Sequence, residues 1–122
     1  MREKIFSSAS WRAKHEDLKE LGEAAALVGY LTMALKITPN LERACAFASE
    51  QLEGRMGQDL KRQMAECYLR FHSSADEALL KFSQRWGQSF PEFGQAIQLV
   101  RGSVAELSRS GRERSLDRAL QL

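Results

Sequence analysis

A chain of 122 residues has the size of one domain that can bury a substantial core. Hydrophobic residues make up 43% and charged residues 28%, an ordinary composition for a globular protein, and no apolar run is long enough to span a bilayer. The formal net charge is +2. Residues 1–100 carry 13 basic and 13 acidic residues, so the excess lies in residues 101–122. This weak bias does not favour nucleic-acid binding, for which a strongly basic face is expected.

The first predicted helix covers residues from about 12 to 36 and follows a flexible lead-in over residues 1–11. Five apolar residues and one threonine recur at alternating steps of three and four, which places them on one helical face. They are Leu18, Leu21, Ala25, Val28, Thr32 and Leu35. Leu27, Leu31 and Ala34 widen this face, so we expect the helix to be central.

Thr38 is the predicted cap of the second helix, with Pro39 in the first turn, where its missing N–H costs nothing. The expected buried face comprises Leu41, Ala44 or Cys45, Ala48 and Leu52. Gly54 then ends the helix as a left-handed C-cap. A third helix over about residues 56–71 carries Met56, Leu60, Met64, Cys67 and Phe71.

Three further helices are predicted from serine caps that are followed three residues later by glutamate, a capping box. These pairs are Ser74 with Glu77, Ser89 with Glu92, and Ser110 with Glu113. The fourth helix has the expected inner face Ala78, Leu79, Phe82 and Trp86 and ends at Gly87. The expected inner face of the fifth helix is Phe90, Phe93, Ile97, Val100, Val104 and Leu107. That of the sixth is Leu116, Ala119 and Leu120. Residues 12–122 are therefore predicted to form one all-α domain, an antiparallel bundle of about six helices.

The start signals at residues 38, 74 and 110 are equally spaced, which would also suit stacked helix pairs of a solenoid. The three segments share their caps and little else. A bundle is the main prediction, and a repeat is the alternative.

No catalytic constellation is visible, so the sequence predicts neither an enzyme nor a cofactor. Cys45 and Cys67 are interpreted as small buried hydrophobic residues, with a disulfide as the alternative. His15 and His72 have no companions at metal-ligand spacing. The acidic residues of the first helix, Glu16, Asp17, Glu20 and Glu23, are interpreted as a solvated face.

Two basic groups are candidate partner-binding residues. The first is the C-terminal group Arg109, Arg112, Arg114 and Arg118, and the second is the pair Lys61 and Arg62. The plain interpretation of both is a solvated face. The functional interpretation is a contact with an acidic partner or with lipid headgroups, because arginine makes directional, bidentate bonds to carboxylates.

Several stretches between and within the predicted helices match one family in order and spacing. They are Gly29–Lys36, Thr38–Ala44, Tyr68–Arg70, Ser73–Leu79, Phe82, Arg85–Gly87, Pro91–Phe93, Leu99–Val104 and Leu116–Leu120. With them, residues 20–122 resemble the soluble cytoplasmic domain of the type II secretion system F family, in the style of its archaeal members. These are membrane platform proteins of secretion machines, type IV pili, Tad-type pili and the archaeal flagellum.

The resemblance implies an antiparallel six-helix bundle at the cytoplasmic face of the cell membrane. It implies that this chain is a fragment of a longer protein, whose membrane helices lie outside it. The implied partners are a secretion ATPase and pilin-like subunits, and a homodimer through a seam on the fifth helix is compatible with it. The chain has one copy of the domain, whereas many bacterial members carry two. Whether the machine serves secretion, adhesion or motility stays open.

A second class of function stays open beside this one. The chain could be a stand-alone soluble helical adaptor or repeat module that binds a partner peptide. An exposed groove would favour that alternative.

Overall fold

The computed structural model describes the backbone of residues 8–69 and 74–122, and the side chains of this set from residue 14 onward. Every regular element in these ranges is an α-helix, which confirms the all-α prediction. The helices are α2 (Ser8–Ile37), α3 (Leu41–Gln51), α4 (Arg55–Tyr68), α5 (Ala75–Gly87), α6 (Pro91–Ser103) and α7 (Arg109–Leu120). Among the described residues, no helix is both long enough and apolar enough for a membrane crossing.

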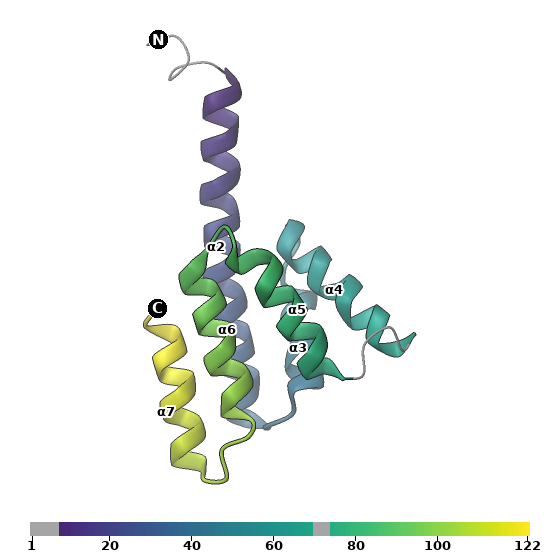
Figure 1. Ribbon diagram of the computed structural model, residues 1–122, viewed down its shortest axis with the longest axis vertical. Coiled ribbons are helices and arrows are strands. Elements are labelled where there is room, and N and C mark those ends of the chain that lie inside the picture. Colours follow the sequence, from purple (N-terminus) through teal and green to yellow (C-terminus); the bar gives the residue numbers. More distant parts are fainter. Residues whose placement is uncertain (1–7, 70–73) are drawn as a thin grey trace.

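Successive helices run in alternating directions around α2, which occupies the centre of the bundle (Figure 1). Helix α2 packs against α3, α4, α6 and α7. In a solenoid each unit contacts only its neighbours along the chain. The packing of α2 on α7 instead closes the arrangement, so the repeat interpretation of the fold is wrong for the described helices.

Helix α2 is longer than predicted, because it begins at Ser8 and its N-terminal half projects beyond the bundle (Figure 1). Among its described side chains, from residue 14 onward, the buried ones are Ala24, Leu27, Val28, Leu31, Thr32 and Leu35. Leu18 and Leu21 are 70% and 52% exposed and Ala25 is exposed, so the N-terminal part of the predicted helix face is not covered by the bundle. Periodicity shows that these residues share a face, but it cannot show where the covering helices end. The predicted flexible lead-in over residues 1–11 is wrong for residues 8–11, which are helical, and residues 1–7 lie outside the described residues.

The predicted inner faces of the other helices are largely confirmed. The buried side chains include Leu41, Ala44, Cys45, Ala48, Leu52, Met56, Leu60, Met64, Ala78, Leu79, Phe82, Phe93, Ile97, Val100, Leu116 and Ala119. The regular spacing of apolar residues in the sequence continues past the end of α6, however. Leu107, which was expected on the inner face of this helix, lies in the loop and is fully exposed. Leu120 is 51% exposed, and Phe71 lies outside the described residues.

Several predicted helix ends are wrong by one or two residues. The N-cap of α3 is Asn40, whose side chain accepts a hydrogen bond from Arg43 N, and that of α7 is Ser108, which accepts from Gly111 N. At α6 the N-cap is Phe90, followed by Pro91, without a side-chain cap. Gly54 precedes α4 with extended backbone and is not a left-handed C-cap. Ser74 alone caps where expected, accepting from Glu77 N at 3.2 Å.

Helices α5 and α6 approach closely at a pair of glycines. A Cβ atom on Gly87 would lie 3.3 Å from the Gly94 Cα, and the reverse holds for Gly94. Phe82 extends the contact, with its ring centroid 6.0 Å from that of Phe93 in an edge-to-face arrangement. Such aromatic pairs stabilise a fold by about 1 kcal/mol beyond the area they bury. The contact fixes the end of α5 that carries Arg85 and Trp86.

Candidate functional site

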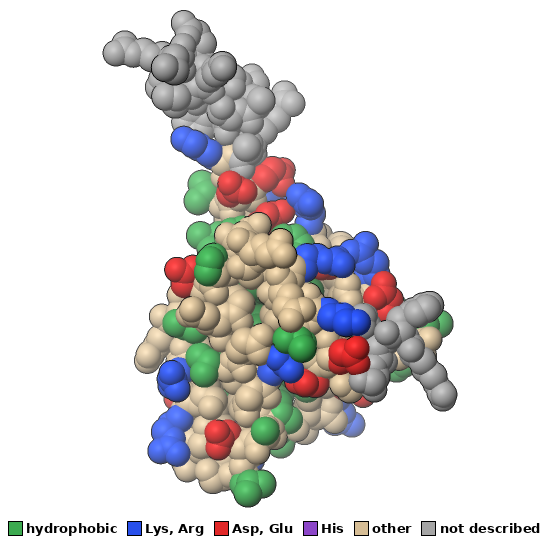
Figure 2. All heavy atoms as spheres, viewed as in Figure 1, with side chains coloured by type: hydrophobic (Ala, Val, Ile, Leu, Met, Phe, Trp, Pro, Cys, Tyr) green, Lys and Arg blue, Asp and Glu red, His purple; other side chains and the backbone are tan. Residues whose placement is uncertain are grey.

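A groove of about 910 Å³ lies at the end of the bundle where α2 projects. It is bounded by α2, the segment between α3 and α4, the first turns of α4 and the last turn of α5. Its lining residues are Glu16, Lys19, Glu20, Glu23, Gln51, Leu52, Glu53, Gly54, Arg55, Gln58, Asp59, Arg62, Arg85 and Trp86. Acidic side chains gather on the projecting part of α2, and basic side chains gather beside them (Figure 2).

A buried carboxylate organises the basic side of this groove. The Asp59 side chain is 5% exposed, and its Oδ1 accepts hydrogen bonds from Arg62 Nη2 and, at 2.8 Å, from Arg85 Nη1. Its Oδ2 accepts from the Trp86 indole Nε1 at 2.8 Å. One buried negative charge therefore holds two guanidinium groups, because a buried charge must be paired and hydrogen-bonded.

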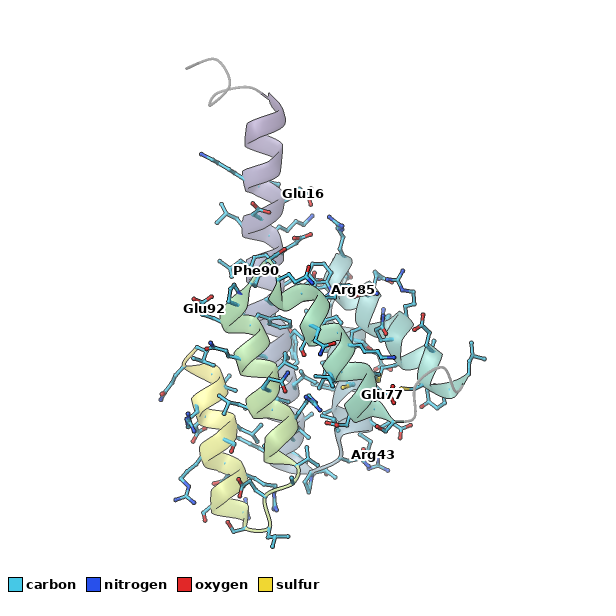
Figure 3. The ribbon with its side chains drawn as sticks, viewed as in Figure 1. Glu16, Arg43, Glu77, Arg85, Phe90 and Glu92 are labelled. Carbon is cyan, nitrogen blue, oxygen red and sulfur yellow. The ribbon has the colours of Figure 1, made fainter. Side chains whose placement is uncertain are left out.

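Both arginines remain open to solvent although Asp59 is covered. The Arg62 and Arg85 side chains are 62% and 54% exposed. Each uses one nitrogen on Asp59, and a guanidinium has five N–H donors, so each retains donors that can serve a ligand. The three groups carry a net charge of +1 at the groove surface. Arg85 lies at the same end of the bundle as Glu16 of the projecting α2 (Figure 3).

The acidic side of the groove is tied to the start of α4. Glu23 Oε1 accepts a hydrogen bond from Met56 N at 2.9 Å, and Glu23 Oε2 accepts from Gly57 N at 3.4 Å. Gly54 provides no side-chain cap, so Glu23 of α2 satisfies amides that a capping residue would otherwise take. A Cβ atom on Gly54 would clash with the Glu23 carboxylate, so a larger residue would displace that side chain from the α4 amides.

An ion pair also joins these two helices at the groove rim. Arg55 Nη1 lies 3.1 Å from Glu20 Oε1, and the Glu20 side chain is 14% exposed. Glu16 and Glu53 are exposed at the rim. The groove thus has a wall rich in carboxylates on α2 and a wall rich in guanidinium groups on α4 and α5.

The predicted C-terminal arginines lie elsewhere, on α7. Arg109 Nε pairs with Glu113 Oε1 at 3.2 Å, and Arg112 Nη1 donates to the Glu106 carbonyl at 3.3 Å. These two arginines line one small cavity of about 190 Å³ with Lys36 and other residues of the α2–α3 turn. Arg114 and Arg118 are exposed on the same helix.

The structure does not unite the two predicted basic groups. Helix α7 packs on α2 and α6, whereas α4 packs on α2, α3 and α5. Lys61 is exposed on α4, and Arg62 belongs to the groove. Sequence reasoning missed Asp59 and Arg85, which are 26 residues apart. Only the Asp59–Arg62 spacing of three within one helix could have pointed to this cluster.

The cysteines do not form a reactive centre. Both thiols are free; Cys45 is buried and Cys67 is half-buried. Burial, and secondarily Cys67, raise the pKa of the Cys45 thiol to about 12. Partial burial, followed by Glu42, Glu77 and Glu66, raises the pKa of Cys67, whose Sγ donates to the Ser74 carbonyl at 3.3 Å. Protonated thiols are poor nucleophiles and poor metal ligands. Within the described part of the chain, no three His, Cys, Asp or Glu residues are grouped to hold a metal ion.

In comparisons with family models, with curated proteins and with solved structures, this chain matches none of them.

Proposed function

We propose that this chain is the cytoplasmic domain of a membrane platform protein in an assembly system like those of type II secretion and type IV pili. The observation that carries the proposal is where the matching stretches fall on the bundle. They supply buried residues to five of the described helices, including Leu31, Leu41, Leu79, Phe93 and Leu116. The matching stretches therefore include positions that determine the packing, and an all-α bundle agrees with the resemblance.

In this role the domain transmits motion and performs no chemistry. It would couple a secretion ATPase to the assembly of pilin-like subunits, at the cytoplasmic face of the membrane. Close-packed protein interiors have low compressibility and transmit strain. A bundle closed around a central helix is suited to carrying a displacement from one end to the other.

The α7 arginines are the proposed contact with the ATPase. Arg114 and Arg118 are exposed on the outer helix, and Arg109 and Arg112 form only exposed or half-exposed contacts. Exposed ion pairs contribute little to stability, so these side chains can exchange their partners. Arginine suits the task because its planar group binds a carboxylate through two bonds at once.

The test is a charge reversal, Arg112→Glu with Arg114→Glu, measured for binding to the purified secretion ATPase and to anionic lipid vesicles. We expect the affinity for the ATPase to fall about tenfold, as charge reversal at an interface does. Arg43→Glu with Lys81→Glu changes the charge equally on α3 and α5 and should leave binding unchanged. Unchanged ATPase binding with lost vesicle binding would assign these arginines to lipid headgroups and contradict the proposed contact.

The groove at Asp59 favours the second candidate function, a stand-alone helical adaptor that binds a peptide. Its volume of about 910 Å³ lies within the range of ligand sites. The two functions differ in what surrounds the domain: a platform protein has membrane helices in the same reading frame, and an adaptor does not.

A further inference from the structure

We propose that the groove between α2, α4 and α5 binds a short polypeptide segment that carries both acidic and basic residues. Its carboxylates would contact Arg62 and Arg85, and its basic residues would face Glu16 and Glu53. This inference does not depend on membership of the platform-protein family.

One carboxylate holds a pair of arginines at the surface of the groove. Arg62 and Arg85 meet at the same Asp59 oxygen, so two like charges are held together at the surface. Like charges in contact repel each other, and one carboxylate cannot neutralise both. An incoming carboxylate would neutralise the remaining charge, and its two oxygens could bond to both guanidinium groups.

The groove is also preorganised. Asp59 is itself held by the Trp86 indole, and the Gly87–Gly94 contact fixes the end of α5. The first turn of α4 is fixed from the other side by Glu23. Binding groups that are already ordered lose less conformational entropy when a ligand arrives.

The carboxylates of the groove favour a polypeptide over a phosphate-rich partner. Glu16, Glu20, Glu23 and Glu53 line the same groove as the arginines. A nucleic-acid backbone or an anionic membrane presents phosphates everywhere and would be repelled by these carboxylates. A polypeptide can place a negative side chain on one wall and a positive side chain on the other. Two turns of α-helix occupy roughly 850 Å³, which is close to the volume of the groove.

The experiment selects ligands from a phage-displayed library of random short peptides on the immobilised chain. Selection on the Arg62→Gln/Arg85→Gln double variant runs in parallel. We expect the native chain to enrich peptides that contain both acidic and basic residues. After synthesis, these peptides should bind the double variant about tenfold more weakly, the loss expected for a charge-assisted contact. Lys81→Gln is the matched control, since Lys81 is also on α5, is 52% exposed and pairs with Glu77 instead.

Fluorescence of Trp86 locates the binding. The chain has two tryptophans, so Trp11→Phe leaves Trp86 as the single reporter in the groove. A selected peptide should change its emission in a saturable manner. Glu16→Gln with Glu53→Gln should remove the preference for basic residues while acidic residues are still selected, which a loss of folding would not do. If the double variant fails to fold by circular dichroism, Arg85→Gln alone replaces it, because Asp59 then keeps Arg62 and Trp86.

Three outcomes would overturn the proposal. One is that no peptide is enriched. Another is that the enriched peptides bind the native chain and the arginine variant equally. The third is that a short RNA or phosphatidylglycerol vesicles bind the native chain, lose binding in the arginine variant, and no peptide does so; the groove would then be a phosphate site.

Discussion

Thr32 and Cys45 are buried side chains whose polar groups affect the stability of the core. Thr32 is 2% exposed, and its Oγ1 makes no hydrogen bond within the described structure. Cys45 is fully buried, and burial keeps its thiol protonated. In apolar surroundings, an unpaired hydroxyl group and an ionised thiol each lower the stability of the folded chain.

Replacing Thr32 by valine exchanges the unpaired hydroxyl for a methyl group of similar size. We expect the Thr32→Val variant to raise the free energy of unfolding by about 1 kcal/mol, because the cost of desolvating the hydroxyl disappears. Thr32→Ser keeps the hydroxyl and removes the methyl group, so it should lower the free energy by about 1 kcal/mol. Urea denaturation measures both. A valine variant less stable than the native chain would contradict this account of Thr32.

Cys45 predicts a loss of stability at alkaline pH. The pKa of its thiol is raised from 9.0 to about 12 in the folded chain, so between these values the unfolded chain releases a proton that the folded chain retains. The free energy of unfolding therefore has its full Cys45 contribution below pH 9.0 and loses it as the pH rises to about 12. Denaturation curves of the native chain and of Cys45→Ala should differ in this pH dependence. Parallel curves would show that Cys45 does not cause it.

The sequence predicts the buried faces of the helices better than it predicts the residues at which the helices begin and end. The apolar faces of α3 to α7 were predictable because burial imposes a spacing of three and four. The caps at Thr38 and Ser110 were misplaced because a second suitable residue, Asn40 or Ser108, stands two positions away. Which of two serines becomes the cap depends on the path of the loop, which tertiary packing decides. Likewise, the exposure of Leu18 depends on where the neighbouring helices end.

The two serines before α7 offer a matched test of this placement. Ser108 accepts a hydrogen bond from Gly111 N at 3.0 Å, whereas Ser110 is inside the helix and exposed. Ser108→Ala should lower the free energy of unfolding by about 1 kcal/mol, the usual value of an N-cap. Ser110→Ala should leave it unchanged or slightly higher, because alanine favours a helix interior. Thermal unfolding of the two variants measures this difference in stability. If Ser110→Ala were the more destabilising substitution, the cap would be Ser110.

The way the helices pack across the whole bundle explains why the candidate groove was not predicted. The all-α class followed from periodicity and caps along the chain. The groove depends on Asp59 meeting Arg85 of another helix and on the projection of α2 beyond its neighbours. Neither feature has a local signal in the sequence. The sequence therefore pointed first to the α7 arginines, where basic charge is concentrated, and reached the groove only through Arg62. The proposed platform protein and the proposed peptide groove are independent, and either can fail alone.

The platform-protein proposal is tested most directly by reading the coding sequence on both sides of codons 1 to 122. The account predicts that the same reading frame encodes several apolar segments of about 20 residues, each long enough to span a bilayer. A frame that contains no such segment on either side would contradict the proposal. A helical adaptor would then be the better account of this domain.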